Sequence, residues 1–152
     1  MKRVLLTGMS GTGKSAVVRD LAARGYKAID TDDGWCEVLA DGRQRWREDA
    51  IATLLATEDA DILFVAGCEE NQVRFRPQFD LIILLSAPVP VLTQRLAART
   101  SNSFGKSPEE LRQVLDDVAA TEPRLRRIAD FEVVTTAPLD EVVTTILQLA
   151  GA

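Results

Sequence analysis

The stretch Gly8-Met9-Ser10-Gly11-Thr12-Gly13-Lys14-Ser15 determines the fold class of this chain. It fits the phosphate-binding loop pattern, in which a glycine is followed by four residues of any kind and then by Gly, Lys and Ser or Thr. Glycines let the backbone turn inward, so that successive N–H groups point at one centre and bind an anion. In such a loop the lysine reaches the β and γ phosphates of a nucleotide, and the next hydroxyl ligates Mg²⁺. We therefore expect Lys14 to act in catalysis and Ser15 to hold the metal.

The residues on either side of this phosphate loop (Gly8–Ser15) have the pattern that the motif requires. Arg3–Thr7 is a short apolar run that ends at a glycine, which is typical of a buried parallel strand. Residues 15–24 carry apolar side chains at helical spacing and predict a helix. A strand, a glycine loop and a helix together predict a nucleotide site. Its expected loop residues are Gly8, Ser10, Gly11, Thr12, Gly13, Lys14 and Ser15.

Length and composition predict one domain that spans residues 1–152. The net charge of −5 argues against a nucleic-acid partner, because such proteins usually present a basic face. The sequence has no apolar stretch long enough to span a membrane and no apolar signal segment before the first strand, so we expect a cytoplasmic protein without a membrane partner. Histidine is absent, so a proton transfer must use a carboxylate, a lysine or the substrate. Cys36 and Cys68 fit neither a metal site nor a disulfide framework.

Further strands and helices alternate along the chain. Apolar runs predict strands at 26–29, 61–66, 81–85 and 131–135, and helical patterns are found at 48–55, 88–99, 108–120 and 139–149. Pro123 predicts a separate turn of helix that reaches residue 129. The segments around Asp41-Gly42 predict either a small hairpin or a helix that ends before this turn. Residues 68–79 predict a polar loop or a short helix, and about 100–107 predict a lid.

This alternation predicts the α/β class, with a five-stranded parallel sheet and helices on both faces. Right-handed crossovers place the carboxyl ends of all parallel strands at one edge. The phosphate loop, the acidic run Asp30–Gly34 and Gly67 should therefore meet there, together with Ser86 and Thr136. The acidic run could be only a turn, since Asp and Gly suit turns. Its place after a strand favours a functional role for at least one of Asp30 and Asp32.

These motifs resemble the small phosphate-loop kinases of the shikimate kinase, gluconate kinase and nucleoside monophosphate kinase type, and shikimate kinase is the nearest type. The resemblance covers the element order of nearly the whole chain and implies the P-loop NTPase fold with strand order 2-3-1-4-5. In shikimate kinase the second strand ends in Asp-Thr-Asp, and residues 30–32 are similar. The resemblance implies that Asp30 assists Mg²⁺ binding and that Asp32 contacts the acceptor hydroxyl and takes its proton.

Further site residues follow from the same resemblance. Gly42–Arg47 is similar to a Gly-x-x-x-Phe-Arg segment whose arginine holds the substrate carboxylate, which gives this role to Arg47. The acceptor-binding region is expected at about 32–57, with substrate contacts from Asp32, Arg47, Gly67 and Asn71. Arg95 and Arg99 share the helix face that leads into the lid and are expected near the nucleotide, as is Pro138 after the last strand. Lys106 is the expected cation of the lid.

The chain also departs from the shikimate kinase pattern. Gly67-Cys68-Glu69 replaces three consecutive glycines after the third strand. Thr121 stands at the position of a later arginine that grips the substrate. Because two features that bind an acid are missing, shikimate itself is not the expected substrate.

The sequence therefore predicts an ATP-dependent, Mg²⁺-requiring kinase that phosphorylates a hydroxyl of a small molecule. One alternative is a nucleotide or nucleoside kinase. Another is an ATP-binding regulatory protein with slow ATPase activity and no acceptor. A small-molecule acceptor is the only partner expected, and the chain is expected to be a monomer or a homodimer.

Overall fold

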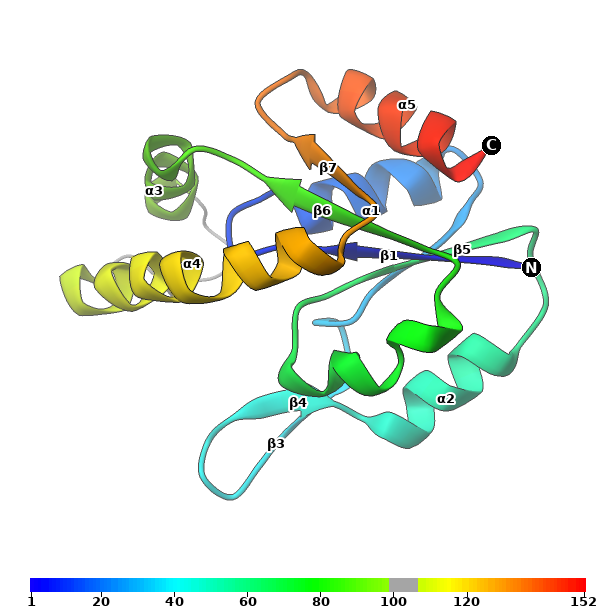
Figure 1. Ribbon diagram of the computed structural model, residues 1–152, viewed down its shortest axis with the longest axis horizontal. Coiled ribbons are helices and arrows are strands. Elements are labelled where there is room, and N and C mark those ends of the chain that lie inside the picture. Colours follow the sequence, from blue (N-terminus) through cyan, green and yellow to red (C-terminus); the bar gives the residue numbers. More distant parts are fainter. Residues whose placement is uncertain (99–106) are drawn as a thin grey trace.

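The computed structural model describes residues 1–98 and 107–152 (Figure 1). Its elements in chain order are β1 (Lys2–Thr7), α1 (Lys14–Ala23), β2 (Lys27–Asp30), β3 (Cys36–Val38), β4 (Gln44–Trp46), α2 (Glu48–Ala56), β5 (Ile62–Ala66), the 3₁₀ helices η1 (Glu70–Arg74) and η2 (Arg76–Gln78), β6 (Leu81–Ser86), α3 (Val89–Ala98), α4 (Pro108–Ile128), β7 (Phe131–Val134) and α5 (Leu139–Ala150).

Five strands form one parallel sheet in the order β2-β5-β1-β6-β7. Counted along the chain within this sheet, the order is 2-3-1-4-5, so the predicted topology is confirmed. The strand β1 lies in the centre, and its residues from Val4 to Thr7 are buried, as their apolar run predicted. The phosphate loop therefore leaves the middle of the sheet.

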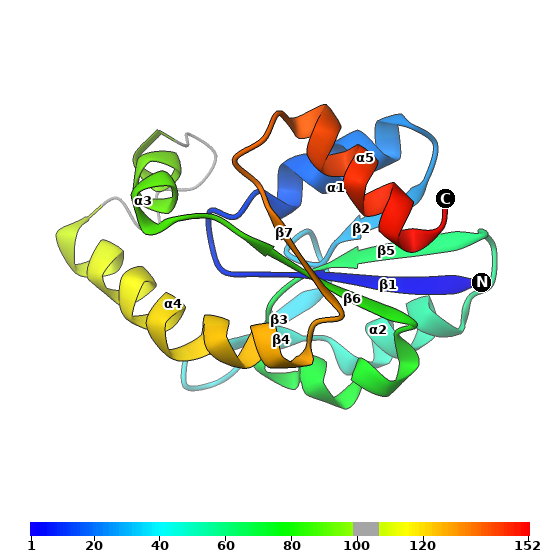
Figure 2. The ribbon, with the colours of Figure 1, turned by 45° about the horizontal axis from the view of Figure 1, so that its top comes forward.

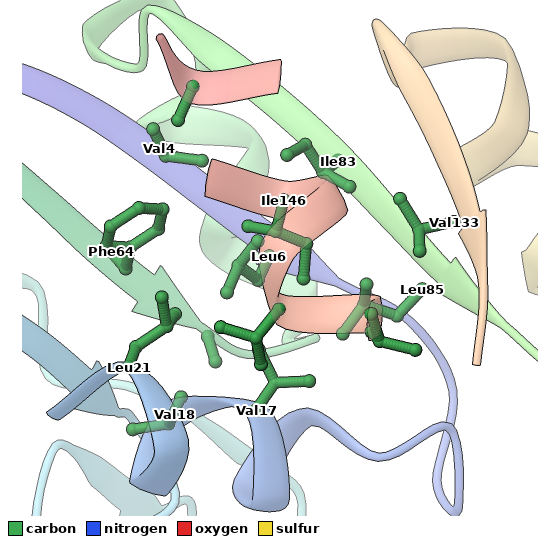
Figure 3. Close-up of a cluster of buried hydrophobic side chains, with 14 of the residues drawn as sticks. Val4, Leu6, Val17, Val18, Leu21, Phe64, Ile83, Leu85, Val133 and Ile146 are labelled. Carbon is green, nitrogen blue, oxygen red and sulfur yellow. The ribbon is translucent and has the colours of Figure 1, made fainter. Parts of the chain in front are cut away.

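Helices cover both faces of the sheet (Figures 1 and 2). On one face, α1 and α5 pack on a cluster that includes Leu6, Phe64 and Ile83 (Figure 3). On the other face, α2 and the segment with η1 and η2 pack on Leu5, Leu63 and Val65 through a second cluster. A smaller cluster joins α3 to α4, with Leu92 and Val114 buried in it. Because these clusters bury apolar side chains on both sides of β1, they hold the central strand and its loop in place.

The structure resolves two alternatives that the sequence left open. The segment around Asp41-Gly42 is a hairpin, in which β3 pairs with β4 in antiparallel register and Cys36 lies opposite Trp46. Gly42 has a φ of 87°, which a glycine adopts at little cost. Residues 68–79 contain short helices, η1 and η2, rather than an unbroken loop.

One prediction about helices was wrong. Residues 108–128 form a single helix, and Pro123 lies inside it. Proline costs a helix about 3 kcal/mol or more, because it lacks an N–H group and clashes with the preceding turn. Val118 and Leu125 are buried on either side of Pro123, so packing offsets the cost of the proline and the helix continues through it. Among the described residues, α4 is the longest helix, and no helix there is long and apolar enough to cross a bilayer.

Candidate active site

The phosphate loop has the backbone that its glycines predicted. Gly11 and Gly13 have φ angles of 85° and 97°, a region that side chains with a Cβ rarely adopt. A Cβ at Gly8 would collide with the carbonyl oxygen of Leu85 on the neighbouring strand β6. The first helical residue of α1 is Lys14. This places the positive end of the α1 dipole at the loop, where it favours an anion.

Lys14 lies across the loop. Its Nζ donates hydrogen bonds to the carbonyl oxygens of Gly8 at 2.5 Å and Met9 at 2.9 Å. Burial lowers the pKa of Lys14, and the nearby side chains Cys68, Asp32, Asp30 and Glu69 act in the opposite direction. A cation held in this way at a glycine loop and the N-terminus of α1 is well placed to meet phosphate oxygens.

The end of β2 reaches the phosphate loop, as the sheet topology predicted. Ser15 at the start of α1 donates its Oγ hydrogen to Oδ2 of Asp30 at 2.7 Å. The other oxygen of Asp30 accepts from the backbone N–H of Asp32 at 3.1 Å, which fixes the turn after the strand. Two hard oxygen donors thus lie together next to the loop, and this donor set fits Mg²⁺. Of the predicted acidic pair, Asp30 faces Ser15 and Asp32 follows it at the same edge.

The carboxylate of Asp32 has an altered acidity. The pKa of Asp32 is raised, first by loss of solvent around the carboxylate and then by the negative charge of Asp30, whereas the charge of Lys14 lowers it. A carboxylate with a raised pKa is a stronger base than an ordinary aspartate when it is ionised.

A buried junction holds the residue between the two aspartates. Thr31 donates its Oγ1 hydrogen to the carbonyl oxygen of Ala66 at 2.8 Å and accepts from Nε1 of Trp46 at 2.9 Å. Trp46 and Thr31 are fully buried. Gly67 lies against both, and a Cβ there would collide with Oγ1 of Thr31. The role of Gly67 in the structure is therefore to let β5, the acidic run and the hairpin approach one another.

Arg95 lies at the phosphate loop, and its hydrogen bonds are to protein groups. Its guanidinium donates to the carbonyl oxygen of Gly11 at 3.1 Å and to the hydroxyl and carbonyl oxygens of Thr135 at 2.9 and 2.6 Å. Thr135 in turn donates to the carbonyl oxygen of Thr12 at 2.7 Å. Arg95 thus ties the loop to α3 and to the end of β7. Pro138 precedes α5 as its N-cap residue. Arg99 and Lys106, and all of the predicted lid except residue 107, lie outside the described residues.

Two predicted substrate residues are engaged elsewhere. Arg47 is exposed, donates to the carbonyl oxygen of Gly34 at 3.2 Å, and lies with Trp35 in a shallow depression beside α2. Asn71 accepts from the backbone N–H of Trp46 at 3.0 Å and donates to its carbonyl oxygen at 2.9 Å. The amide of Asn71 therefore anchors the hairpin.

A cleft of about 790 Å³ opens beside the loop, and we call it the acceptor cleft. The walls come from the phosphate loop, the hairpin, η1, η2 and α4, with Met9, Arg43, Gln44, Cys68, Glu69, Glu70, Gln72, Val73, Arg76, Asp117, Thr121, Arg124, Leu125 and Ile128 as lining residues. Sequence reasoning did not assign Glu69 to the site. Its place directly after β5, at the carboxyl edge of the sheet, was the signal that could have found it.

Sequence comparison finds that the chain is similar to shikimate kinases. It is 28% identical to shikimate kinase 2 of Yersinia enterocolitica, over 96% of this chain and 94% of the relative. It is also 28% identical to a shikimate kinase of Neisseria gonorrhoeae, with the same shares covered. The resemblance predicted from the motifs is confirmed.

Solved structures agree with the fold. The shikimate kinase of Acinetobacter baumannii, solved in complex with shikimate, matches with a TM-score of 0.72 and 18% identity over 98% of this chain and 92% of that chain. A gluconokinase of Sinorhizobium meliloti matches with a TM-score of 0.63 and 20% identity over 99% of this chain and 91% of that chain. At these identities the likeness establishes the phosphate-loop kinase fold. A family profile described as "AAA domain" matches residues 4–116, and the chain belongs to this family.

Proposed function

We propose that this protein is a kinase that transfers the γ-phosphate of ATP to a hydroxyl group of a small molecule. The observation that carries the proposal is the hydrogen bond between Ser15 and Asp30. It brings the acidic run after β2 to the phosphate loop, so that a second carboxylate, that of Asp32, lies near Lys14. A site that only holds a nucleotide has no need of a base there, whereas transfer to a hydroxyl does.

The loop and Lys14 would bind the phosphates of ATP. The inward N–H groups and the N-terminus of α1 supply fixed partial positive charge, and Lys14 supplies a full one. Ser15 and Asp30 would hold Mg²⁺, which when bound neutralises charge on the β and γ oxygens. Arg95 would act indirectly, because its bonds to Gly11 and Thr135 keep the loop in its binding conformation.

Asp32 would orient the acceptor and take its proton. A hydroxyl that enters from the acceptor cleft meets Asp32 at the border formed by Glu69, because the two carboxylates lie within 4.8 Å of each other. Removal of the proton raises the nucleophilicity of the oxygen as it approaches the γ-phosphate. We give Asn71 a positioning role at the hairpin and Arg47 one at the turn after β2, in place of the substrate contacts that were first expected.

The test is acceptor-dependent release of ADP. The purified chain is mixed with ATP and Mg²⁺, and polyols, amino-polyols, hydroxy acids, nucleosides and nucleoside monophosphates are added singly. We expect one class to raise ADP release above basal hydrolysis and to yield a phosphorylated product by mass spectrometry. If a nucleoside or its monophosphate is the product-forming acceptor, the nucleotide kinase alternative is correct. If none of them raises release above the basal rate, the regulatory alternative replaces this proposal.

A further inference from the structure

The acceptor cleft contains a carboxylate, that of Glu69, for which the proposed reaction has no use. Glu69 follows β5 by way of Gly67 and Cys68 and reaches the side of the cleft nearest the reacting groups. One of its oxygens, one oxygen of Asp32 and the Sγ of Cys36 all lie within 4.8 Å of one another. Two acidic side chains therefore flank the place that the proposed function gives to the acceptor hydroxyl.

The position of Glu69 is fixed by its neighbours. Its Oε1 accepts a hydrogen bond from Nε2 of Gln44 in the hairpin at 2.8 Å. Its backbone N–H donates to Oε1 of Gln72 at 3.4 Å, and Gln72 is buried and bonded to Thr7 of β1. These contacts come from two different elements, so Glu69 is not a freely moving surface side chain. Burial raises the pKa of Glu69, as does the charge of Asp32, while the bond from Gln44 lowers it.

The cations around Glu69 have other partners. Arg43 is paired with Asp41 at 2.6 Å and with Glu70 at 3.0 Å. Lys14 is directed to the loop carbonyls and is assigned to the phosphates. Within the described residues, Glu69 accepts hydrogen bonds from the amide of Gln44 and, at 3.9 Å, from the thiol of Cys36, and it has no ion pair.

The positive charge of the cleft lies mainly at its other end. Arg76 borders Ile128, the last residue of α4, and Ile82 near the start of β6, on the side of the sheet away from the phosphate loop. Arg124 lines the cleft one turn before Ile128. Thr121, farther toward the loop on the same helix, carries no charge. The end of the cleft where transfer would occur is thus acidic, and the remote end is basic.

We propose that Glu69 is a specificity-determining residue, and that it selects acceptors which carry an ammonium group next to the hydroxyl that is phosphorylated. The class is that of hydroxylated amines, such as amino-polyols and amino sugars. This inference rests on the proposed kinase function. An ammonium group between Asp32 and Glu69 relieves the repulsion of two close carboxylates and can donate hydrogen bonds to both. A carboxylate at the same place would face two like charges and would be rejected.

Two matched sets of acceptors test the proposal. Serinol, glycerol and glycerate form the small set, and glucosamine, glucose and gluconate form the larger one. In each set an amine, a neutral group and a carboxylate are compared. Steady-state transfer from ATP is measured for the wild-type chain, for Glu69→Gln, and for Glu58→Gln as a control. Glu58 pairs with Arg3 on the opposite edge of the sheet and is 66% exposed, so its variant changes net charge equally outside the cleft.

We expect the amines to have kcat/KM values about tenfold or more above the neutral analogues, since hydrogen bonds to charged groups contribute about 1.5–3 kcal/mol. Glu69→Gln should remove most of this advantage through KM, with little change in kcat for the neutral acceptors. Glu58→Gln should leave the order unchanged. If gluconate or glycerate is preferred, or if Glu69→Gln lowers all three kinds of acceptor equally, the proposed selectivity is wrong.

Binding is measured separately, so that the two proposals can fail independently. Thermal shifts with serinol and glucosamine are recorded in the presence of Mg²⁺ and a nonhydrolysable ATP analogue. Glu69-dependent binding of the amines without any transfer would leave the ammonium subsite in place and remove the kinase function. Transfer to neutral acceptors without better binding of amines would retain the kinase and overturn the role of Glu69.

Discussion

The two halves of the candidate site are built in different ways. The phosphate half is a continuous stretch, Gly8–Ser15, and its shape depends on backbone angles at glycines and on a close approach to β6. The acceptor half is assembled from side chains of separate segments, including the turn after β2, the hairpin, η1 and α4. The phosphate half depends on backbone angles that glycine adopts readily. The acceptor half depends on side chains from segments that are far apart in the sequence.

This difference explains where the chain departs from its relatives. The phosphate loop keeps the full pattern, because a Cβ at Gly8 would collide with β6 and because Gly11 and Gly13 adopt left-handed angles. In the acceptor half, Cys68-Glu69 and Thr121 depart from the shikimate kinase pattern, while the sheet and its strand order are retained. Side chains that only line a cleft can be exchanged without strain in the backbone. The proposed function therefore predicts that the acceptor can change while the fold does not.

The largest effect is expected in the phosphate half. Lys14→Ala removes the cation assigned to the phosphates, and we expect transfer to fall about 100-fold or more, with weaker ATP binding. Transfer rate and ATP affinity are the measurements. Lys27→Ala is the matched control, because Lys27 pairs with Asp59 at the far end of β2. Undiminished ATP affinity in Lys14→Ala would remove the phosphate loop from its assigned role.

The second effect separates the two halves. Asp32→Asn keeps the shape of the side chain but removes the base, and we expect transfer to fall about 10²–10⁴-fold while ATP binding is retained. Asp33→Asn, at the next position in the same turn, should change transfer little. The rates come from single-turnover transfer, and the affinities come from equilibrium titration with ATP. Equal transfer by the wild type and Asp32→Asn would exclude Asp32 as the base.

A smaller effect is expected at the junction that joins the halves. Trp46→Phe removes the hydrogen bond from Nε1 to Thr31, and we expect a loss of about 1–3 kcal/mol in the free energy of unfolding. Because Thr31 lies between Asp30 and Asp32, the KM for the acceptor should rise more than the KM for ATP. Urea unfolding and the two KM values are the measurements. A parallel rise of both KM values would show that the halves are not built independently.

The smallest effect is expected on stability, at the contact between the sheet and α4, the helix that forms one wall of the acceptor cleft. Glu132 of β7 accepts from Arg126 of α4 at 2.7 Å and from Ser86 of β6 at 2.7 Å, and these bonds lower the pKa of Glu132, with Arg126 as the larger cause. Because the pKa of Glu132 is lowered in the folded protein, its bonds stabilise the fold at pH values above the pKa of a glutamate in the unfolded chain, about 4.3. This stabilisation is lost as the pH falls through the pKa of Glu132 in the folded protein.

Glu132→Gln should therefore destabilise the protein at pH 7 by less than about 1 kcal/mol, and the difference from wild type should shrink toward pH 3. Thermal unfolding between pH 3 and 7 measures it. A difference that stays constant over this range would mean that the ionised carboxylate does not contribute.

Local patterns predicted much of this molecule from sequence. Each sheet strand was predicted within a residue or two. The apolar runs of β1, β5 and β6 are buried between the two helical layers, whereas the edge strands β2 and β7 are more exposed. Alternation of strands and helices placed Asp30 near the phosphate loop, since crossovers of one hand leave all carboxyl ends at one edge. The helix boundary predicted at Pro123 was wrong, because the cost of a proline inside a helix can be read from the sequence, whereas the burial of Val118 and Leu125, which offsets it, cannot.

The sequence by itself determined the phosphate loop, the parallel sheet and the meeting of Ser15 with the acidic run, because these depend on backbone conformation and chain topology. The order of the strands followed from the resemblance to the small phosphate-loop kinases. Only the tertiary structure decided the acceptor half. It directed Asn71 to the backbone of Trp46, left Arg47 outside the acceptor cleft, and brought Glu69 within reach of Asp32. Those outcomes depend on which of several polar partners lies nearest after packing, and spacing along the chain does not carry that information.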